Sequence, residues 1–268
     1  MNVLVVLLDL PKSAMTFVVF VLLVSVVIGP VVAAPNAVIQ NEGSYVDIAG
    51  YYHMVGEVKN TGDVWLQFVR ISATLKDQTG AIVDMPFTYT TLNRLPPDIA
   101  TGFDLVELDT TKSAQVRSYS LSLEFQQAEP LSNHLVVTNI TSSTDFLGWL
   151  QVLGEVQNTG DSISEYTEVI GTFYGTDGKV VDVTFTFTDP TTVQPGGQQP
   201  FKLIVLSAER SSLVNTWILQ AESRQYTSVP ELPWQPALFL AATILLSLFL
   251  LRRRHRTRIE AKQGALPT

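Results

Sequence analysis

The chain contains no cysteine among its 268 residues. This absence excludes a disulfide framework, a zinc site built from thiolates and a cysteine nucleophile. Stability must then come from the burial of apolar side chains. A domain that relies on its core alone is expected to need roughly 90–100 residues rather than 40.

Histidine is nearly as scarce, with only His53, His134 and His255 in the chain. A catalytic triad or a two-histidine zinc site needs histidines grouped with other functional side chains, and no such grouping recurs here. Glycine-rich loops with the spacing of a phosphate-binding motif are also missing. We therefore expect no enzymatic activity, no catalytic residues and no cofactor.

Basic side chains are few in the middle of the chain. Residues 35–235 hold 23 acidic and 10 basic residues, a net charge of −13. Nucleic-acid binding needs clustered lysine and arginine, so this body is not expected to bind nucleic acid. The same charge disfavours adsorption to anionic lipid.

The C-terminal region has the pattern of a membrane anchor. Residues 232–251 carry no charge, and twenty helical residues span about 30 Å, the thickness of the hydrocarbon core. Five arginines follow within residues 252–258. Because positive charge stays on the cytoplasmic side, the pattern predicts a transmembrane helix at 232–251 and a basic cytoplasmic tail at 252–268.

The N-terminal region is also apolar. Residues 14–34 lack charge and end in Val32, Ala33 and Ala34, a small-residue pattern suited to signal peptidase. Residues 1–34 are therefore interpreted as a signal peptide or a retained signal anchor. Either alternative gives a protein of the cell membrane whose body is extracytoplasmic.

The body is an internal duplication. The stretch Gly56–Asp63 recurs as Gly154–Asp161, an offset of 98 residues. At this offset, 24 of the 78 positions from 47 to 124 are identical, about four times the number expected by chance. A repeat of this length indicates two copies of one structural unit.

Each copy has the alternation of β-strands. From Val181 to Thr188, apolar and polar residues alternate with a period of two, and residues 83–90 keep the same phase. Pro86 lacks an N–H group, so its strand is expected at a sheet edge or at a bulge. Further strands are expected at 51–59, 65–76, 101–108 and 116–125, and at 149–157, 163–174, 199–206 and 214–222.

Turn signals separate these strands. Asn60-Thr61-Gly62, its counterpart at 158–160 and Asp177-Gly178 suit tight turns, and no amphipathic helix is evident. The pattern predicts an all-β fold with two tandem antiparallel β-sandwich domains. The expected boundaries are a first domain at 35–126, a linker at 127–133, a second domain at 134–224 and a stalk at 225–231.

Both copies resemble the FxLYD family of extracytoplasmic domains from archaeal and bacterial envelope proteins. The resemblance rests on residues 55–63, 77–80 and 97–103, and on 153–161, 175–178 and 195–201. The namesake stretch keeps Leu75 and Asp77 in one copy and Tyr174 in the other. The resemblance implies that each domain is an immunoglobulin-like sandwich, and it implies no catalytic residues.

Three aspartates recur at the same offset. Carboxylates that converge with backbone carbonyls could bind Ca²⁺, although such aspartates also cap turns or simply face solvent. The calcium candidates are Asp47, Asp63, Asp84, Asp145, Asp161 and Asp182. No other metal site is expected.

Two further pairs of polar residues recur between apolar neighbours. Glu57 and Glu155 are expected to face solvent or the partner domain. Asn60 and Asn158 are expected to form local hydrogen bonds from side chain to backbone.

One glycosylation signal lies in the predicted extracytoplasmic body. Asn139-Ile140-Thr141 is an N-glycosylation sequon, and the first copy has no equivalent. Asn139 is therefore the predicted glycosylation site.

Two functions remain open at this point. The first is a non-enzymatic, membrane-anchored cell-surface protein that presents two β-sandwich modules for scaffolding or for interaction with a protein or envelope partner. Duplication suits it, because a repeated unit adds reach and avidity. The alternative is a ligand- or calcium-binding sensor subunit of a membrane complex, although a tail of 17 residues is short for signalling.

Overall fold

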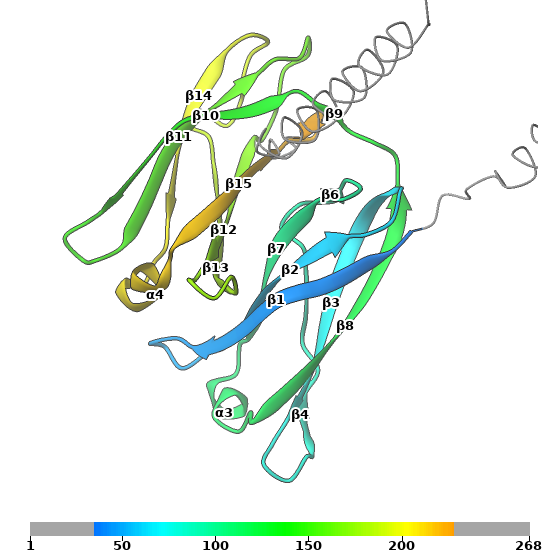
Figure 1. Cartoon of the computed structure of the whole chain (residues 1–268), viewed down its shortest axis with the longest axis vertical. Helices are drawn as coiled ribbons and strands as arrows, with labels where there is room; N and C mark the ends of the chain where they lie inside the picture. Colours follow the sequence, from blue (N-terminus) through cyan, green and yellow to red (C-terminus); the bar gives the residue numbers. More distant parts are fainter. Residues whose placement is uncertain (1–34, 228–268) are drawn as a thin grey trace, which may run out of the picture. The chain divides into compact units, whose positions relative to one another are not determined.

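A computed structural model describes residues 35–227 (Figure 1). The predicted signal segment at 1–34, the helix at 232–251 and the tail at 252–268 lie outside the described residues. Within 35–227, no helix is both long enough and apolar enough to cross a membrane.

The first repeat, residues 37–128, is built almost entirely of strands. Its elements are β1 (Ala37–Val46), β2 (Tyr52–Asn60), β3 (Trp65–Lys76), β4 (Ile82–Asp84), β5 (Phe87–Tyr89), β6 (Arg94–Leu95), β7 (Ala100–Glu107), the short helix α3 (Thr110–Ser113) and β8 (Ser118–Ala128).

The second repeat, residues 132–227, follows the same order. Its elements are β9 (Ser132–Asn133), β10 (Leu135–Thr144), β11 (Leu150–Asn158), β12 (Glu168–Tyr174), β13 (Val180–Phe187), β14 (Gln198–Ile204), α4 (Ala208–Leu213), β15 (Thr216–Glu222) and β16 (Tyr226–Thr227).

Each repeat contributes two sheets, which confirms the predicted all-β, sandwich-like fold. In the first repeat β2 lies between β1 and β7, while β3 pairs with β4, β5, β6 and β8 (Figure 1). In the second repeat β11 lies between β10 and β14, and the other sheet has the order β13-β12-β15-β16-β9. The ladders are antiparallel except for the short parallel pair of β16 and β9.

The first strand of each repeat escaped prediction because a bulge interrupts its alternation. The register of β1 shifts between Gln40 and Gly43, and that of β10 shifts between Thr138 and Thr141. In both bulges an asparagine, Asn41 or Asn139, has φ of 54°. Asparagine tolerates this left-handed conformation better than most residues, so the two copies share the bulge as well as the strand.

Pro86 behaves as predicted. It separates β4 from β5, and both pieces pair with β3 alone, at the edge of their sheet. The carbonyl of Pro86 still accepts a hydrogen bond from the Ala73 N–H. Thr184 occupies the same position in the second repeat, where β13 runs unbroken.

Each repeat has an apolar core. One core gathers around Phe103 and also includes Ile170 of the second repeat, and the other gathers around Phe201. A Cβ atom added to Gly56 would lie 2.8 Å from the Phe103 ring, and one added to Gly154 would lie 2.7 Å from the Phe201 ring. Only glycine fits beneath these rings, which explains why the glycine recurs.

The predicted backbone bonds of the two asparagines are confirmed. Asn60 is fully buried, and its Nδ2 donates to the carbonyls of Val64 at 2.8 Å and Leu95 at 3.0 Å. Asn158 makes the same two bonds, to the carbonyls at positions 162 and 193. Each asparagine therefore ties the end of one strand to two neighbouring loops.

The ends of the second repeat differ from the expected boundaries. Strand β8 continues to Ala128, and β9 falls inside the predicted linker. Tyr226, placed by prediction in the stalk, is buried in β16, and its hydroxyl accepts from the Ser162 N–H at 2.8 Å. A buried aromatic ring with a partner for its hydroxyl stabilises this short strand.

Candidate functional site between the two repeats

The two repeats are joined by a mixed apolar and polar contact, here called the joint. Its apolar part consists of Val55 from the first repeat and Tyr174, Val180 and Val183 from the second, with Tyr45 packed against them. Gly102 on β7 allows the close approach, because a Cβ atom there would lie 2.6 Å from Thr172 Oγ1 and 2.8 Å from Val183.

Glu57 lies in the joint and faces the second repeat, one of the two alternatives expected from the sequence. Its side chain is only 4% exposed and accepts from Tyr174 Oη at 2.6 Å. Gln40 Nε2 and Asn41 Nδ2 each donate to it at 2.7 Å. Burial, followed by the neighbouring Glu57, raises the pKa of Tyr174, so its hydroxyl stays protonated and acts as the donor.

A second buried carboxylate crosses between the repeats. Glu222 on β15 accepts from the backbone N–H of Asn93 and of Arg94, both at 3.1 Å, and from Asn93 Nδ2 at 2.7 Å. Its cross-strand partner is Glu168. Burial and the adjacent Glu222 raise the pKa of Glu168 to about 7.

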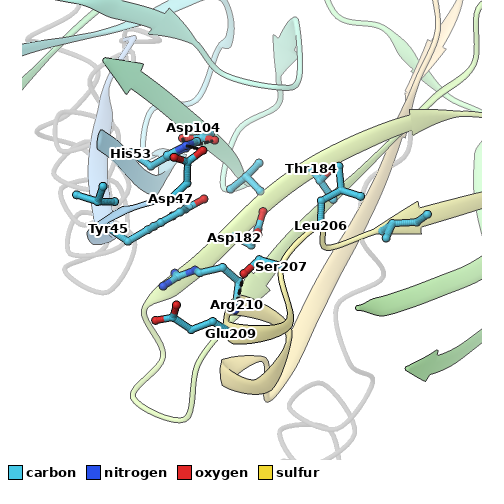
Figure 2. A pocket seen from close by; sticks show the side chains of 13 residues that line it. Tyr45, Asp47, His53, Asp104, Asp182, Thr184, Leu206, Ser207, Glu209 and Arg210 are labelled. Carbon is cyan, nitrogen blue, oxygen red and sulfur yellow. Dashed lines mark hydrogen bonds and ion pairs between the residues drawn. The ribbon is translucent and has the colours of Figure 1, made fainter. Parts of the chain in front are cut away.

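Beside the joint lies a pocket of about 320 Å³ (Figure 2). Figure 2 shows Tyr45, Asp47, His53 and Asp104 of the first repeat and Asp182, Ser207, Glu209 and Arg210 of the second around the same space. The wall is therefore built by both copies.

His53 contacts three other residues that line the pocket. Its ring stacks on Tyr45 with centroids 4.6 Å apart, and its Nδ1 lies 2.9 Å from Asp104 Oδ2. Nε2 lies 3.5 Å from Asp47 Oδ2. Burial alone would lower the pKa of His53, but the hydrogen bonds and charges of Asp104 and Asp47 raise it above its usual value.

Asp182 is the titratable group on the opposite wall. Burial, followed by repulsion from Asp104, raises its pKa to about 6, and nearby Arg210 and His53 oppose this shift. The guanidinium of Arg210 lies 4.0 Å from the centre of the Tyr45 ring, and its Nε donates to the Val181 carbonyl at 2.9 Å. The second repeat thus places a cation on an aromatic ring of the first.

The charge of the pocket is mainly negative. Four carboxyl groups line it, at positions 47, 104, 182 and 209, against the guanidinium of Arg210 and a readily protonated His53. Such a lining suits a small ligand that carries positive charge and hydrogen-bond donors.

The calcium candidates are spread over the two repeats. Asp47 and Asp145 close equivalent turns by accepting from the N–H of Tyr51 and of Trp149. Within residues 35–227, no group of three or more acidic, histidine or cysteine side chains is arranged to hold a metal ion.

The remaining candidates have other surroundings. Asp84 pairs with Lys112, and Asp161 accepts from Tyr226 Oη at 3.1 Å. Asp63 lies in the turn after β2. Only Asp47 and Asp182 face a shared space, the pocket of Figure 2.

The predicted glycosylation site lies on the second repeat, away from the joint residues. Asn139 is exposed in the bulge of β10, and its Nδ2 donates to Glu155 Oε2. Glu155 also accepts from Gln198 Nε2 at 3.1 Å. Glu155 is half-buried, so the repeat of Glu57 lies in open surroundings rather than in the joint.

Sequence reasoning missed the pocket residues Tyr45, His53, Asp104 and Arg210. A usable signal exists in the repeat, because the first three positions change character between copies. They correspond to Ser143, Gln151 and Lys202 in the second copy. Positions that differ between the copies therefore indicate the surface of the first repeat that lines the pocket, a role that the same surface of the second repeat does not have.

Comparison with known proteins adds no family. No family model matches the chain, and no curated protein matches it. Among solved structures, red sea bream transglutaminase aligns at 12% identity over 75% of this chain and 32% of its own, with a TM-score of 0.25. The Amycolatopsis orientalis exo-chitosanase CsxA aligns at 10% identity over 71% of this chain and 26% of its own, also with a TM-score of 0.25. The chain therefore spans a third or less of each.

Proposed function

We propose that the chain is a non-enzymatic, single-pass cell-surface protein that presents two immunoglobulin-like sandwich modules as one stiff body for scaffolding or interaction at the envelope. The observation that carries the proposal is the joint. Glu57 and Glu222 are each buried and bonded across the repeats, so the modules are held together by specific contacts rather than only by a linker.

Stiffness matters for such a role. Domains joined by small polar interfaces usually move relative to each other. A buried carboxylate that loses its partner costs more than an exposed one, so Glu57 and Tyr174 resist separation. A stiff pair of modules holds a binding surface at a fixed distance from its anchor.

The sandwich modules are supported by the repeat itself. Each copy has two sheets and a buried core, and the resemblance of both copies to the FxLYD family points to the same kind of module. The pattern of residues 232–268 supports a membrane anchor with the body outside.

Location is tested by protease treatment of intact cells that express the full chain with an epitope after residue 268. The expected result is loss of the body and survival of a short epitope-bearing fragment that is protected by the membrane. A body that stays intact until the cells are opened rejects the proposed topology.

Scaffolding is tested by affinity purification of the full chain from detergent-solubilised native membranes. The control is the variant Gly102→Val, which should open the joint while leaving both cores in place. An envelope component that copurifies with the wild type and less with the control supports a role for the stiff pair. Equal recovery with both would show that the joint is not needed for interaction.

A ligand-binding sensor is the second candidate, and the pocket favours it. Its excess of carboxyl groups suits a small amine or another cationic ligand. The test is the melting temperature of the full chain with millimolar Ca²⁺ and, separately, with millimolar diamine. A shift that disappears in Asp104→Asn supports this candidate, and no shift with either rejects it for these ligands.

A further inference from the structure

The joint uses one surface of the first repeat and a different surface of the second. Because the repeats share one fold, each also has an equivalent of the surface that the other contributes, and this equivalent lies outside the joint. The first repeat presents β1, β2, β6 and β7 to the joint, and the second presents β12, β13 and β15. The equivalent of the first surface on the second repeat is centred on β10, β11 and β14. The equivalent of the second surface on the first repeat is β3, β4, β5 and β8.

These two unused surfaces keep apolar residues where the joint has them. Leu153 stands at the position of Val55, Ile82 at that of Val180, and Met85 at that of Val183. In the joint, Val55 is 1% exposed, whereas Leu153 is 39%, Ile82 61% and Met85 60% exposed. The unused surfaces thus carry apolar side chains at the positions equivalent to those of the joint, and no other part of residues 35–227 covers these side chains.

Charges on the unused surfaces are complementary. Lys76 stands at the position of Tyr174, so it would face Glu155 as Tyr174 faces Glu57. Lys202 stands at the position of Asp104, and it would face Asp84, which also pairs with Lys112 of its own repeat. The like-charged pair Asp104 and Asp182 of the joint is therefore replaced by a pair of opposite charges.

We propose that a second copy of this chain docks head to tail, with β10, β11 and β14 of one chain against β3 and β4 of the next. Asn139 bonds Glu155 within this surface, so the docking requires that Asn139 carry no glycan. A contact between two different surfaces does not close on itself after two copies. It therefore produces a ring or an open series of chains rather than an isologous dimer.

Two positions make this contact weaker than the joint. Ser143 replaces Tyr45, so the stack with histidine and arginine is absent, and Pro200 replaces Gly102. Met85, unbranched and flexible, replaces Val183 opposite this proline and can move aside where valine cannot. Thr74 keeps the place of Thr172, which a Cβ at Gly102 would approach to 2.6 Å, so the docked surfaces stand further apart near Pro200 than the surfaces of the joint. The association is reversible and depends on protein concentration.

The natural absence of cysteine allows a direct test in the full chain. In detergent solution, the double variant Met85→Cys/Leu153→Cys is treated with an oxidant. Both positions are exposed, so the fold should tolerate the changes. A disulfide needs Cα atoms within about 7 Å, so only a specific contact links the chains.

The expected result is a ladder of dimers, trimers and longer products. A mixture of the two single variants should give dimers that contain one chain of each kind. Single variants alone should stay monomeric. A double variant that stays monomeric overturns the proposal. Equal dimerisation of the Leu153→Cys single variant also overturns it, as does a disulfide product that contains a different protein.

Charge exchange provides the second test. Sedimentation of the full chain in detergent should show that Lys76→Glu weakens association roughly tenfold, because it places like charges together. The double variant Lys76→Glu/Glu155→Lys should restore association. The exposed Lys179→Glu is the control and should change little. Failure of the double variant to restore association contradicts this pairing.

Discussion

Tyr174 of the second repeat donates its hydroxyl to Glu57 of the first across 2.6 Å, although the two residues are 117 positions apart in the chain. With Gln40 and Asn41, it completes the set of donors around a buried carboxylate. The bond therefore connects the recurring stretch Gly56–Asp63, which contains Glu57, to the surface of the second repeat that forms the joint.

Removing this hydroxyl should destabilise the protein. Tyr174→Phe leaves Glu57 buried with two donors instead of three, and we expect a loss of about 2 kcal/mol in the free energy of unfolding. Urea unfolding followed by fluorescence measures it. Tyr89→Phe, at an exposed tyrosine, is the matched control. Equal stability of the two variants would show that the bond contributes little.

Close approach of the repeats should depend on Gly102. Gly102→Ala places a Cβ atom 2.6 Å from Thr172 Oγ1, so we expect a loss of about 1–3 kcal/mol from overpacking. Gly43→Ala is the control, since its Cβ would have ordinary contact with the Val180 carbonyl at 3.4 Å. Hydrogen exchange should rise at β7 and β12 in the first variant alone.

Asn60 and Asn158 should contribute equally to the stability of their repeats. Asn60→Ala and Asn158→Ala each remove a buried amide that bonds two carbonyls, and each should cost about 2–3 kcal/mol. The exposed Asn215→Ala is the control. Thermal unfolding compares the three, and a large effect in one repeat alone would contradict equivalent roles.

Stability should fall as the pH rises through the range set by Glu168. Its folded pKa is about 7 and its unfolded value is about 4.5, so the folded chain holds this proton more tightly. The contribution is complete below pH 4.5 and is lost as the pH approaches 7. Glu168→Gln should therefore raise the melting temperature at pH 8 more than at pH 4.5.

The exposed Glu129→Gln serves as the control for this pH series. Its melting temperature should follow the wild type at both pH values. If Glu168→Gln also follows the wild type, the pKa of Glu168 in the folded protein lies close to its unfolded value of about 4.5.

Much of the strand pattern follows from sequence because alternation is local. The run from Val181 to Thr188 predicts β13, and Pro86 predicts the edge position that β4 and β5 occupy. The first strands of the repeats were missed because Asn41 and Asn139 interrupt the alternation with a left-handed residue.

The site was less predictable, because its residues are brought together by packing between repeats. No spacing rule connects His53 to Asp182, and burial of Glu57 depends on Tyr174, which is distant in sequence. The carboxylates considered for calcium were chosen because they recur. Recurrence selected Asp47 and Asp182, which line the pocket, but it could not select Tyr45, His53 and Asp104, because these positions differ between the copies.

Gly56 and Gly154, each beneath a phenylalanine ring, change how their motif should be read in other sequences. The letters shared by the two copies describe contacts inside a module: a ring above a glycine, and an asparagine that holds two loops. The glutamate between them has a different neighbour in each copy. This stretch therefore predicts the fold of a chain that carries it. The residues that bind a ligand must be sought at the positions that differ between copies.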